Sequence, residues 1–230
     1  MSYVNDGERS RWPLVFEVTQ SKPNPTSAIQ NESKTARGAW VALLLIGLAS
    51  MVAQGFGRFT FPVLLTAIDR ELLGSYTLAG FLSNVPLVAY LIGTGFTSLL
   101  STRSDPTHLM KIGVTLSVLG LGSMSISPSV WTLALALFVA GFGAALVWVP
   151  APGIAASMVG PTQGGLAIGL VGSGIGTGVM LAGPLTSAVR TVSGNEFSWR
   201  PVYALQALFG VAVLLGLFLV LRRGEKPGTS

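Results

Sequence analysis

Long apolar stretches alternate with short polar ones along this chain, and one uncharged stretch dominates the pattern. From Ile112 to Val189, 78 consecutive residues include no Asp, Glu, Lys, Arg or His. A soluble domain of this size needs charged side chains on its loops and outer faces. Hydrocarbon rejects such side chains, at about 2.5–3.5 kcal/mol each at mid-membrane. The pattern therefore predicts a protein that lives in a lipid bilayer.

Six apolar segments follow a polar beginning, and each is predicted to be a transmembrane helix. A helix pairs its backbone polar groups within the segment, whereas an open strand would leave them unpaired in lipid. The segments are also too long and too continuously apolar for the alternating strands of a membrane barrel. We therefore expect an all-α membrane protein, a six-helix bundle that permits a 3+3 arrangement. The predicted spans are 39–66, 78–100, 108–126, 130–158, 166–189 and 202–221.

The predicted domain boundaries follow from the same pattern. Residues 1–37 are polar and contain nine charged residues, which favours a disordered tail. Residues 38–222 form the transmembrane domain, and residues 223–230 form a C-terminal tail. With the N-terminus inside, seven Lys and Arg flank the spans on the inner side and three on the outer side. We expect both tails to be cytoplasmic and the protein to be a multi-pass protein of the bacterial inner membrane.

Composition narrows the possible chemistry. The chain has no cysteine and a single histidine, His108, so metal sites and thiol chemistry lack ligands and nucleophiles. Every Asp and Glu falls outside the predicted spans, so the membrane-embedded part lacks a general acid or base. The 14 Lys and Arg are scattered, which argues against nucleic acid as a partner. We expect no metal, no cofactor and no enzymatic activity.

Arg58, inside the first apolar segment, is the most informative single residue. A permanent cation within a span is costly unless it meets a wet cavity or a partner, so it predicts a functional site. Gln54 lies one helical turn earlier and can share the site. The pair would then bind an anionic group or form a gating ion pair. Alternatively, Arg58 snorkels to the outer interface, because it lies about 28 Å along a helix from Ala39 in a membrane core of about 30 Å.

Five further polar or aromatic residues are candidates for lining a substrate cavity. For several of them a structural role is an equal or better interpretation: a tryptophan can pack, an asparagine can bond across helices, and hydroxyls can bond their own helix carbonyls. These candidates are Asn84, Tyr90, Trp148, Ser173 and Thr177.

Prolines and glycines predict kinks and close helix packing. Pro150 and Pro152 each remove an amide donor and should kink or unwind the fourth segment. The fifth segment is rich in glycines, several of them four residues apart, which favours close approach of helix backbones. A helix this thin could also bend during a conformational cycle. The residues assigned to kinks and packing are Pro62, Pro150, Pro152, Gly178, Gly183 and Pro184.

Short motifs in four of the spans resemble a known family. The sequence Gly57-Arg58-Phe59 is followed by Pro62, and the fourth span has glycines at 141 and 143 before Pro150. The fifth has Gly178 and then Gly183-Pro184, and Ser198-Trp199-Arg200 precedes the sixth. In this order and spacing they resemble the N-terminal six-helix half of a major facilitator superfamily transporter, and the first span is most similar to the YbfB/YjiJ branch.

The resemblance implies transport of a small solute by alternating access, with the substrate between two six-helix halves. The chain would then be truncated, or would need a separate second half or a second copy. Two departures from the family pattern stand out: residues 93–103 lack the usual Asp and Arg cluster, and Leu137 replaces an arginine. A non-transporting membrane protein for binding or assembly, or a nonfunctional fragment, is the alternative.

Overall fold

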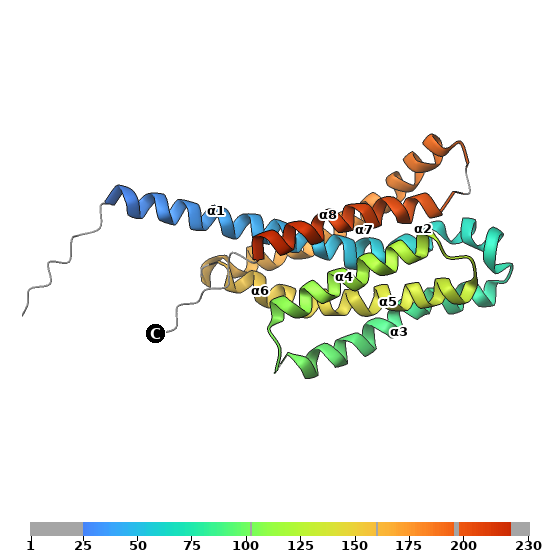
Figure 1. The fold of residues 1–230 in the computed structure, drawn as a ribbon, viewed down its shortest axis with the longest axis horizontal. Coiled ribbons are helices and arrows are strands. Elements are labelled where there is room, and N and C mark those ends of the chain that lie inside the picture. The colour runs from blue at the N-terminus through green and yellow to red at the C-terminus, as the bar shows by residue number, and fades with distance from the viewer. Residues whose placement is uncertain (1–24, 102, 160, 196–197, 222–230) are drawn as a thin grey trace, which may run out of the picture. The chain divides into compact units, whose positions relative to one another are not determined.

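The computed structural model describes residues 25–101, 103–159, 161–195 and 198–221, which are helical apart from short connections. Contacts divide the chain into residues 1–36 and 37–230, and the fold below is that of the second unit. In chain order (Figure 1), the elements are α1 (Pro25–Ser50), η1 (Met51–Phe56), α2 (Gly57–Ile68), η2 (Asp69–Leu73), α3 (Tyr76–Leu100), α4 (Pro106–Ser125), α5 (Val130–Trp148), α6 (Ala151–Ser157), η3 (Pro161–Gln163), α7 (Gly164–Ser193) and α8 (Arg200–Leu221).

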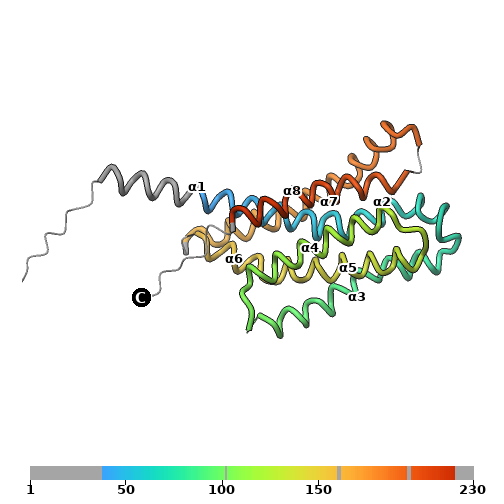
Figure 2. The backbone as a smooth tube through the Cα atoms, in the orientation of Figure 1, coloured from blue at the N-terminus to red at the C-terminus, as the bar shows by residue number. Residues whose placement is uncertain are grey.

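The first helix is longer than the sequence pattern predicts. From residue 38 onward its backbone runs through η1 and α2 without reversing (Figure 2). Helix α1 begins at Pro25 instead of residue 39. Residues 25–37, which the sequence pattern assigned to a disordered tail, are therefore helical. Six of these 13 residues are Ala, Gln, Glu, Lys or Arg, which favour helices, and proline suits the first helical position. Residues 1–24 and 222–230, the other parts of the predicted tails, lie outside the described residues.

Five of the described helical stretches are long and apolar enough to cross a membrane: 38–73, 76–100, 130–157, 164–193 and 200–220. Helix α4, at the predicted third span, is not among them. It packs against both α5 and α8, so much of its surface is covered by protein. Small residues such as Gly113, Ser117 and Gly120 are buried there. A helix enclosed by other helices needs less apolar surface than one facing lipid. Its membrane crossing stays a prediction.

Small residues let α5 approach α3 and α4 closely. Helix α5 packs against α3 on one side and α4 on the other, as Figure 1 shows. A Cβ placed on Gly141 would lie 2.7 Å from the Cα of Pro86 in α3. One on Gly143 would lie 2.8 Å from the backbone nitrogen of Ser117 in α4. The glycines of the fourth-span motif therefore serve packing on both sides of α5.

A second close approach joins the first membrane helix to α7. A Cβ on Gly55 of η1 would lie 2.7 Å from the Cα of Gly178. At another level along the pair, a Cβ on Gly174 would overlap the carbonyl oxygen of Gly47. Gly176 and Gly183 have nothing within 4 Å of an added Cβ, so the glycines of α7 differ in role. Gly178 lies at this close approach, whereas Gly183 has open space beside it.

The fourth apolar segment is interrupted where the sequence predicts a kink. Helix α5 ends at Trp148 and α6 begins at Ala151, with Val149 and Pro150 between them. Pro152 occupies the first turn of α6, where a missing amide hydrogen costs little. The two prolines therefore end one helix and start the next, and Pro150 is buried at the joint.

Polar side chains tie three connections together at one end of the bundle. The indole nitrogen of Trp199 donates to Oε2 of Glu71 at 2.5 Å. Arg200 forms an ion pair with the same carboxylate and donates to the Ser127 carbonyl oxygen at 3.0 Å. This end clamp (Glu71, Ser127, Trp199 and Arg200) links η2, the α4–α5 connection and the start of α8. The Trp-Arg pair that the sequence shows as a family motif has a structural role here.

Candidate functional site

Arg58 and Gln54 form the predicted polar pair within the first membrane helix. Nη1 of Arg58 donates to Oε1 of Gln54 at 3.1 Å. Gln54 belongs to the π-helical turn η1 and is buried, whereas Arg58 lies in the first turn of α2 and is partly exposed. The amide oxygen holds one edge of the guanidinium and leaves its other donors available. The local expectation from i,i+4 spacing is therefore confirmed in geometry.

Tyr90 of α3 completes the cluster. The guanidinium carbon of Arg58 lies 4.7 Å from the centre of the Tyr90 ring, a cation–π distance. Phe59 contributes a more distant ring at 6.0 Å. Tyr90 itself packs against the hydrophobic core, which fixes its position. Two helices thus hold the cation in place, one by a hydrogen bond and one by an aromatic face. We call Gln54, Arg58 and Tyr90 the Arg58 cluster.

The Arg58 cluster lies near the middle of both helices. The apolar helix that contains Arg58 spans residues 38–73. At about 1.5 Å per residue, Arg58 is about 30 Å from Gly38 and about 22 Å from Leu73. Tyr90 is likewise about 21 Å from Tyr76 and about 15 Å from Leu100, the ends of α3. The half-thickness of a membrane core is about 15 Å. The helix of residues 38–73 is longer than a membrane core, so a functional cation near mid-membrane and a cation that snorkels to the interface both stay predictions.

The backbone around the Arg58 cluster is irregular. Residues Met51–Phe56 form a π-helix directly before α2, and such turns occur often at functional sites. Pro62 lies inside α2 and has no amide hydrogen, so the carbonyl of Arg58, four residues earlier, lacks its usual helix donor. Irregular backbone is tolerated at membrane depth only against protein or a water-lined cavity.

Arg58 has no acidic partner in the part of the chain that the structure describes. The ion pair found there joins Arg200 to Glu71. The gating-pair interpretation of Arg58 therefore has no acidic partner among the described residues. A partly exposed guanidinium, held by an amide and a ring, is suited to contact an anionic group from outside the bundle.

The other predicted cavity residues do not join the Arg58 cluster through any described bond. Nδ2 of Asn84 donates to the Gly80 carbonyl at 2.8 Å, within its own helix. The Ser173 hydroxyl donates to Leu170 and that of Thr177 to Ser173, at 2.7 and 2.8 Å, also within one helix. Asn84, Ser173 and Thr177 are exposed, whereas Trp148 is half-buried and packs against the core. Their roles at a substrate site stay predictions.

The sequence pattern did not predict the contacts of Gln206 or the cavities lined by Arg190 and Pro184, because these depend on the fold. Nε2 of Gln206 in α8 donates to Oγ1 of Thr60 in α2 at 2.9 Å, and both side chains are buried. Arg190, near the end of α7, lines a cavity away from the Arg58 cluster. Pro184, expected at a kink, lines an apolar cavity of about 400 Å³ with Met51 and Gln206. Gln206 lies within an apolar segment, and a polar residue there is a signal that the sequence offers.

Comparison with known proteins places the chain in a family. Residues 40–230 match the model of the Major Facilitator Superfamily. The chain is 28% identical over 185 residues to the "Uncharacterized transporter YgaY" of Escherichia coli O157:H7, covering 76% of this chain and 44% of that protein. It is 24% identical over 230 residues to the "Probable actinorhodin transporter" of Streptomyces coelicolor, covering 97% of this chain and 38% of that protein.

A solved structure shares the fold. The inward-open xylose transporter XylE of Escherichia coli superposes with a TM-score of 0.61 at 18% identity, over 81% of this chain and 47% of that chain. The chain thus spans less than half the length of these relatives. The predicted fold class, an all-α membrane bundle like one half of this fold, is confirmed. With a family match that covers most of its length, the chain belongs to the major facilitator superfamily.

Proposed function

We propose that this six-helix bundle forms one wall of a secondary transporter that moves a small solute by alternating access. Transporters of this superfamily hold their substrate near mid-membrane between two six-helix units. The position of Tyr90 near the middle of α3 and the partial exposure of Arg58 support placing the Arg58 cluster at that depth. The second wall would come from six further helices or from a second copy of the chain.

The solute class follows from the Arg58 cluster. Gln54 and Tyr90 stabilise the guanidinium without neutralising its charge, because one offers an amide oxygen and the other a ring face. The site therefore has a net positive charge near mid-membrane, where an opposite charge is strongly attracted. We propose that the transported solute has a carboxylate or another anionic group. The Arg58 contacts are the observation on which this proposal depends.

Finer assignments are part of the proposal. The similarity of Gly57-Arg58-Phe59 and Pro62 to the YbfB/YjiJ branch supports placement there. The excess of Lys and Arg on one side supports a bacterial inner membrane protein with cytoplasmic termini. That the chain is not an enzyme also stays a prediction, supported by the absence of acidic residues from the predicted spans.

Substitution of Arg58 tests the proposal. Uptake of a panel of small anionic solutes and neutral analogues is measured in proteoliposomes, with wild type, Arg58→Lys and Arg58→Ala. We expect Arg58→Ala to lose about tenfold or more of anion uptake, because a hydrogen bond to a charged group contributes about 1.5–3 kcal/mol. Arg58→Lys should retain part of the activity, since lysine keeps the positive charge but lacks the paired N–H donors of the guanidinium.

The control is Arg103→Ala, an exposed cation in the α3–α4 connection, which should leave uptake unchanged. Equal uptake by all Arg58 variants would leave only a snorkelling role for this residue. No uptake by folded protein, alone or with a co-expressed second half, would instead support a non-transporting binding or assembly protein.

A further inference from the structure

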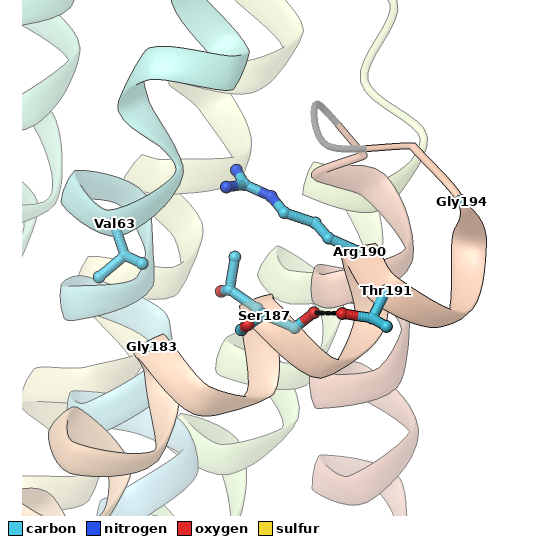
Figure 3. Close-up of a pocket in the computed structure, with 7 residues that line it drawn as sticks. Val63, Gly183, Ser187, Arg190, Thr191 and Gly194 are labelled. Atoms are coloured by element: carbon cyan, nitrogen blue, oxygen red, sulfur yellow. Dashed lines mark hydrogen bonds between the residues drawn. The ribbon is translucent and has the colours of Figure 1, made fainter.

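A cavity of about 630 Å³ lies between α2 and the last turns of α7. Its lining includes Val63 from α2 and Gly183, Thr186, Ser187, Arg190 and Thr191 from α7. Figure 3 shows the Arg190 side chain extending from α7 across this space, toward the helix that contains Val63. We call this space the Arg190 pocket. It is far larger than one water molecule needs.

Two donor nitrogens of Arg190 have no hydrogen-bond acceptor among the described residues. Nε and Nη2 are both buried, and neither forms a hydrogen bond within the described structure. These two nitrogens lie on the same edge of the guanidinium, the edge that binds an oxyanion through two parallel hydrogen bonds. A buried donor without an acceptor costs about 1–3 kcal/mol, more when charged. The unpaired edge therefore indicates a ligand with two oxygens.

In the part of the chain that the structure describes, no partner accounts for the position of Arg190. A cation in the last turn of a helix often bonds the final carbonyls, but the buried nitrogens of Arg190 do not. Among the described residues no carboxylate lies within ion-pair distance of it, since the ion pair there is Arg200 with Glu71. Asp69, the first residue of η2, also has a buried carboxylate oxygen without a hydrogen-bond partner. A pair between Asp69 and Arg190 is therefore the alternative that the experiment must test.

The hydroxyl groups that line the Arg190 pocket differ in whether their hydrogen is free to donate to a ligand. Thr186 and Thr191 donate to the carbonyls of Ala182 and Ser187 at 2.7 and 3.0 Å, so their hydrogens are engaged. Figure 3 shows Ser187 between Gly183 and Arg190 on α7. Ser187 is exposed, and its hydroxyl can donate to a bound oxygen. Arg190 therefore offers two charged N–H donors, and Ser187 offers one neutral hydroxyl donor.

The Arg190 pocket is distinct from the Arg58 cluster. Val63 follows Arg58 by five residues, which places the two about 140° apart around the helix at 3.6 residues per turn. Arg190 lies three residues before the end of α7, where the chain leaves the apolar segment. The Arg190 pocket is therefore at a membrane boundary, whereas the Arg58 cluster is near the middle.

We infer that the Arg190 pocket binds a phosphate group, through Nε and Nη2 of Arg190 and the Ser187 hydroxyl. A phosphate offers the paired oxygens that this edge requires, and the space beyond it can accept the rest of a larger molecule. At a membrane boundary such a group comes either from a lipid headgroup or from a phosphorylated solute in water.

The experiment measures binding and needs no transport, so its outcome is independent of the Arg58 proposal. Thermal unfolding of the purified chain is followed in detergent with sodium phosphate or glycerol 3-phosphate. It is then followed in nanodiscs of phosphatidylglycerol against nanodiscs of a galactolipid, whose headgroup has no phosphate. We expect a ligand-dependent rise in melting temperature that is weakened about tenfold or more in apparent affinity by Arg190→Gln. Arg190→Lys should weaken it less, and the exposed Arg103→Gln should not change it.

The two arms identify the source of the phosphate. A response to the soluble phosphates indicates a solute, and a response to phosphatidylglycerol alone indicates a lipid headgroup. Equal responses in wild type and Arg190→Gln, or no response to any probe, would overturn the inference. If Arg190→Gln does not fold, unchanged affinity in both Arg190→Lys and Ser187→Ala would overturn it equally. An internal pair is the answer if no probe binds and Asp69→Asn destabilises the chain as much as Arg190→Gln does.

Discussion

Charged and polar side chains join the helices of this protein at two depths, and their surroundings give them different roles. The Arg58 cluster holds a cation near the middle of two helices without an acidic partner among the described residues. The end clamp holds Glu71 between an indole and a guanidinium at the edge of the bundle. The first arrangement leaves charge available for a ligand, and the second neutralises charge to join connections.

Glu71→Ala should destabilise the end clamp through Trp199 more than through Arg200. The ion pair is about a third to a half exposed on both sides, so it contributes only about 0–1 kcal/mol. Trp199 is 1% exposed, and its indole donor would lose its acceptor, at about 1–3 kcal/mol. We expect a fall in melting temperature for Glu71→Ala in detergent and a smaller one for Glu71→Gln, whose amide oxygen can still accept.

A double-mutant cycle checks the cause of that loss. Trp199→Phe removes the indole donor and keeps a buried ring, so Glu71→Ala should cost less in this background than in wild type. Additive losses would show that the indole bond does not contribute and that the ion pair with Arg200 is the stabilising contact.

At the scale of elements, the close helix crossings depend on particular glycines. Gly174 and Gly176 lie on the same helix two residues apart, yet only Gly174 meets a backbone. Gly174→Ala should separate α7 from α1 and lower the melting temperature strongly, by the several degrees typical of overpacking. Gly176→Ala should be neutral or stabilising, because alanine favours the helix by about 1 kcal/mol.

Unfolding of both variants in one detergent compares them directly, with circular dichroism confirming helix content. Equal melting temperatures for Gly174→Ala and Gly176→Ala would show that α1 and α7 do not cross at this point.

The sequence predicts the elements better than their contacts. The ends of α3, of α5 and α6 taken together, and of α8 fall within about two residues of the predicted segments, because the change from apolar to polar residues marks them. The start of α1 was missed because its polar residues are also good helix formers. The glycines of α7 all look alike in sequence, and only the fold distinguishes Gly178, which packs, from Gly176, which does not.

The same limit applies to the candidate site. The Arg58–Gln54 pair could be predicted because i,i+4 spacing places both on one face of a helix. Tyr90 was a candidate by itself, but its contact with Arg58 joins two helices and needs the tertiary fold. Arg190 reads in sequence as an ordinary cation at a span end, and only its unbonded buried nitrogens set it apart.

At the scale of the whole molecule, the orientation in the membrane can be tested with two serines. Ser101, at the end of α3, and Ser193, at the end of α7, are both exposed. The chain has no cysteine, so Ser101→Cys and Ser193→Cys each introduce one thiol with little change in size. With the termini inside, a membrane-impermeant maleimide should label Ser193→Cys in intact cells and Ser101→Cys only in inverted vesicles.

Labelling after detergent solubilisation is the control, since both thiols should then react. The reverse pattern of labelling would place the termini outside and contradict the orientation expected from the Lys and Arg distribution.

The paired contacts of Gly47 with Gly174 and of Gly55 with Gly178 have a mechanical consequence. Two helix backbones that touch at two levels along their length resist both sliding and rolling against each other. We therefore expect this pair of helices to move as one rigid unit. Any tilting of this helix pair must move Arg58 and the Arg190 pocket together. Flexing is then left to joints elsewhere, such as Val149–Pro150, where the helix is already interrupted.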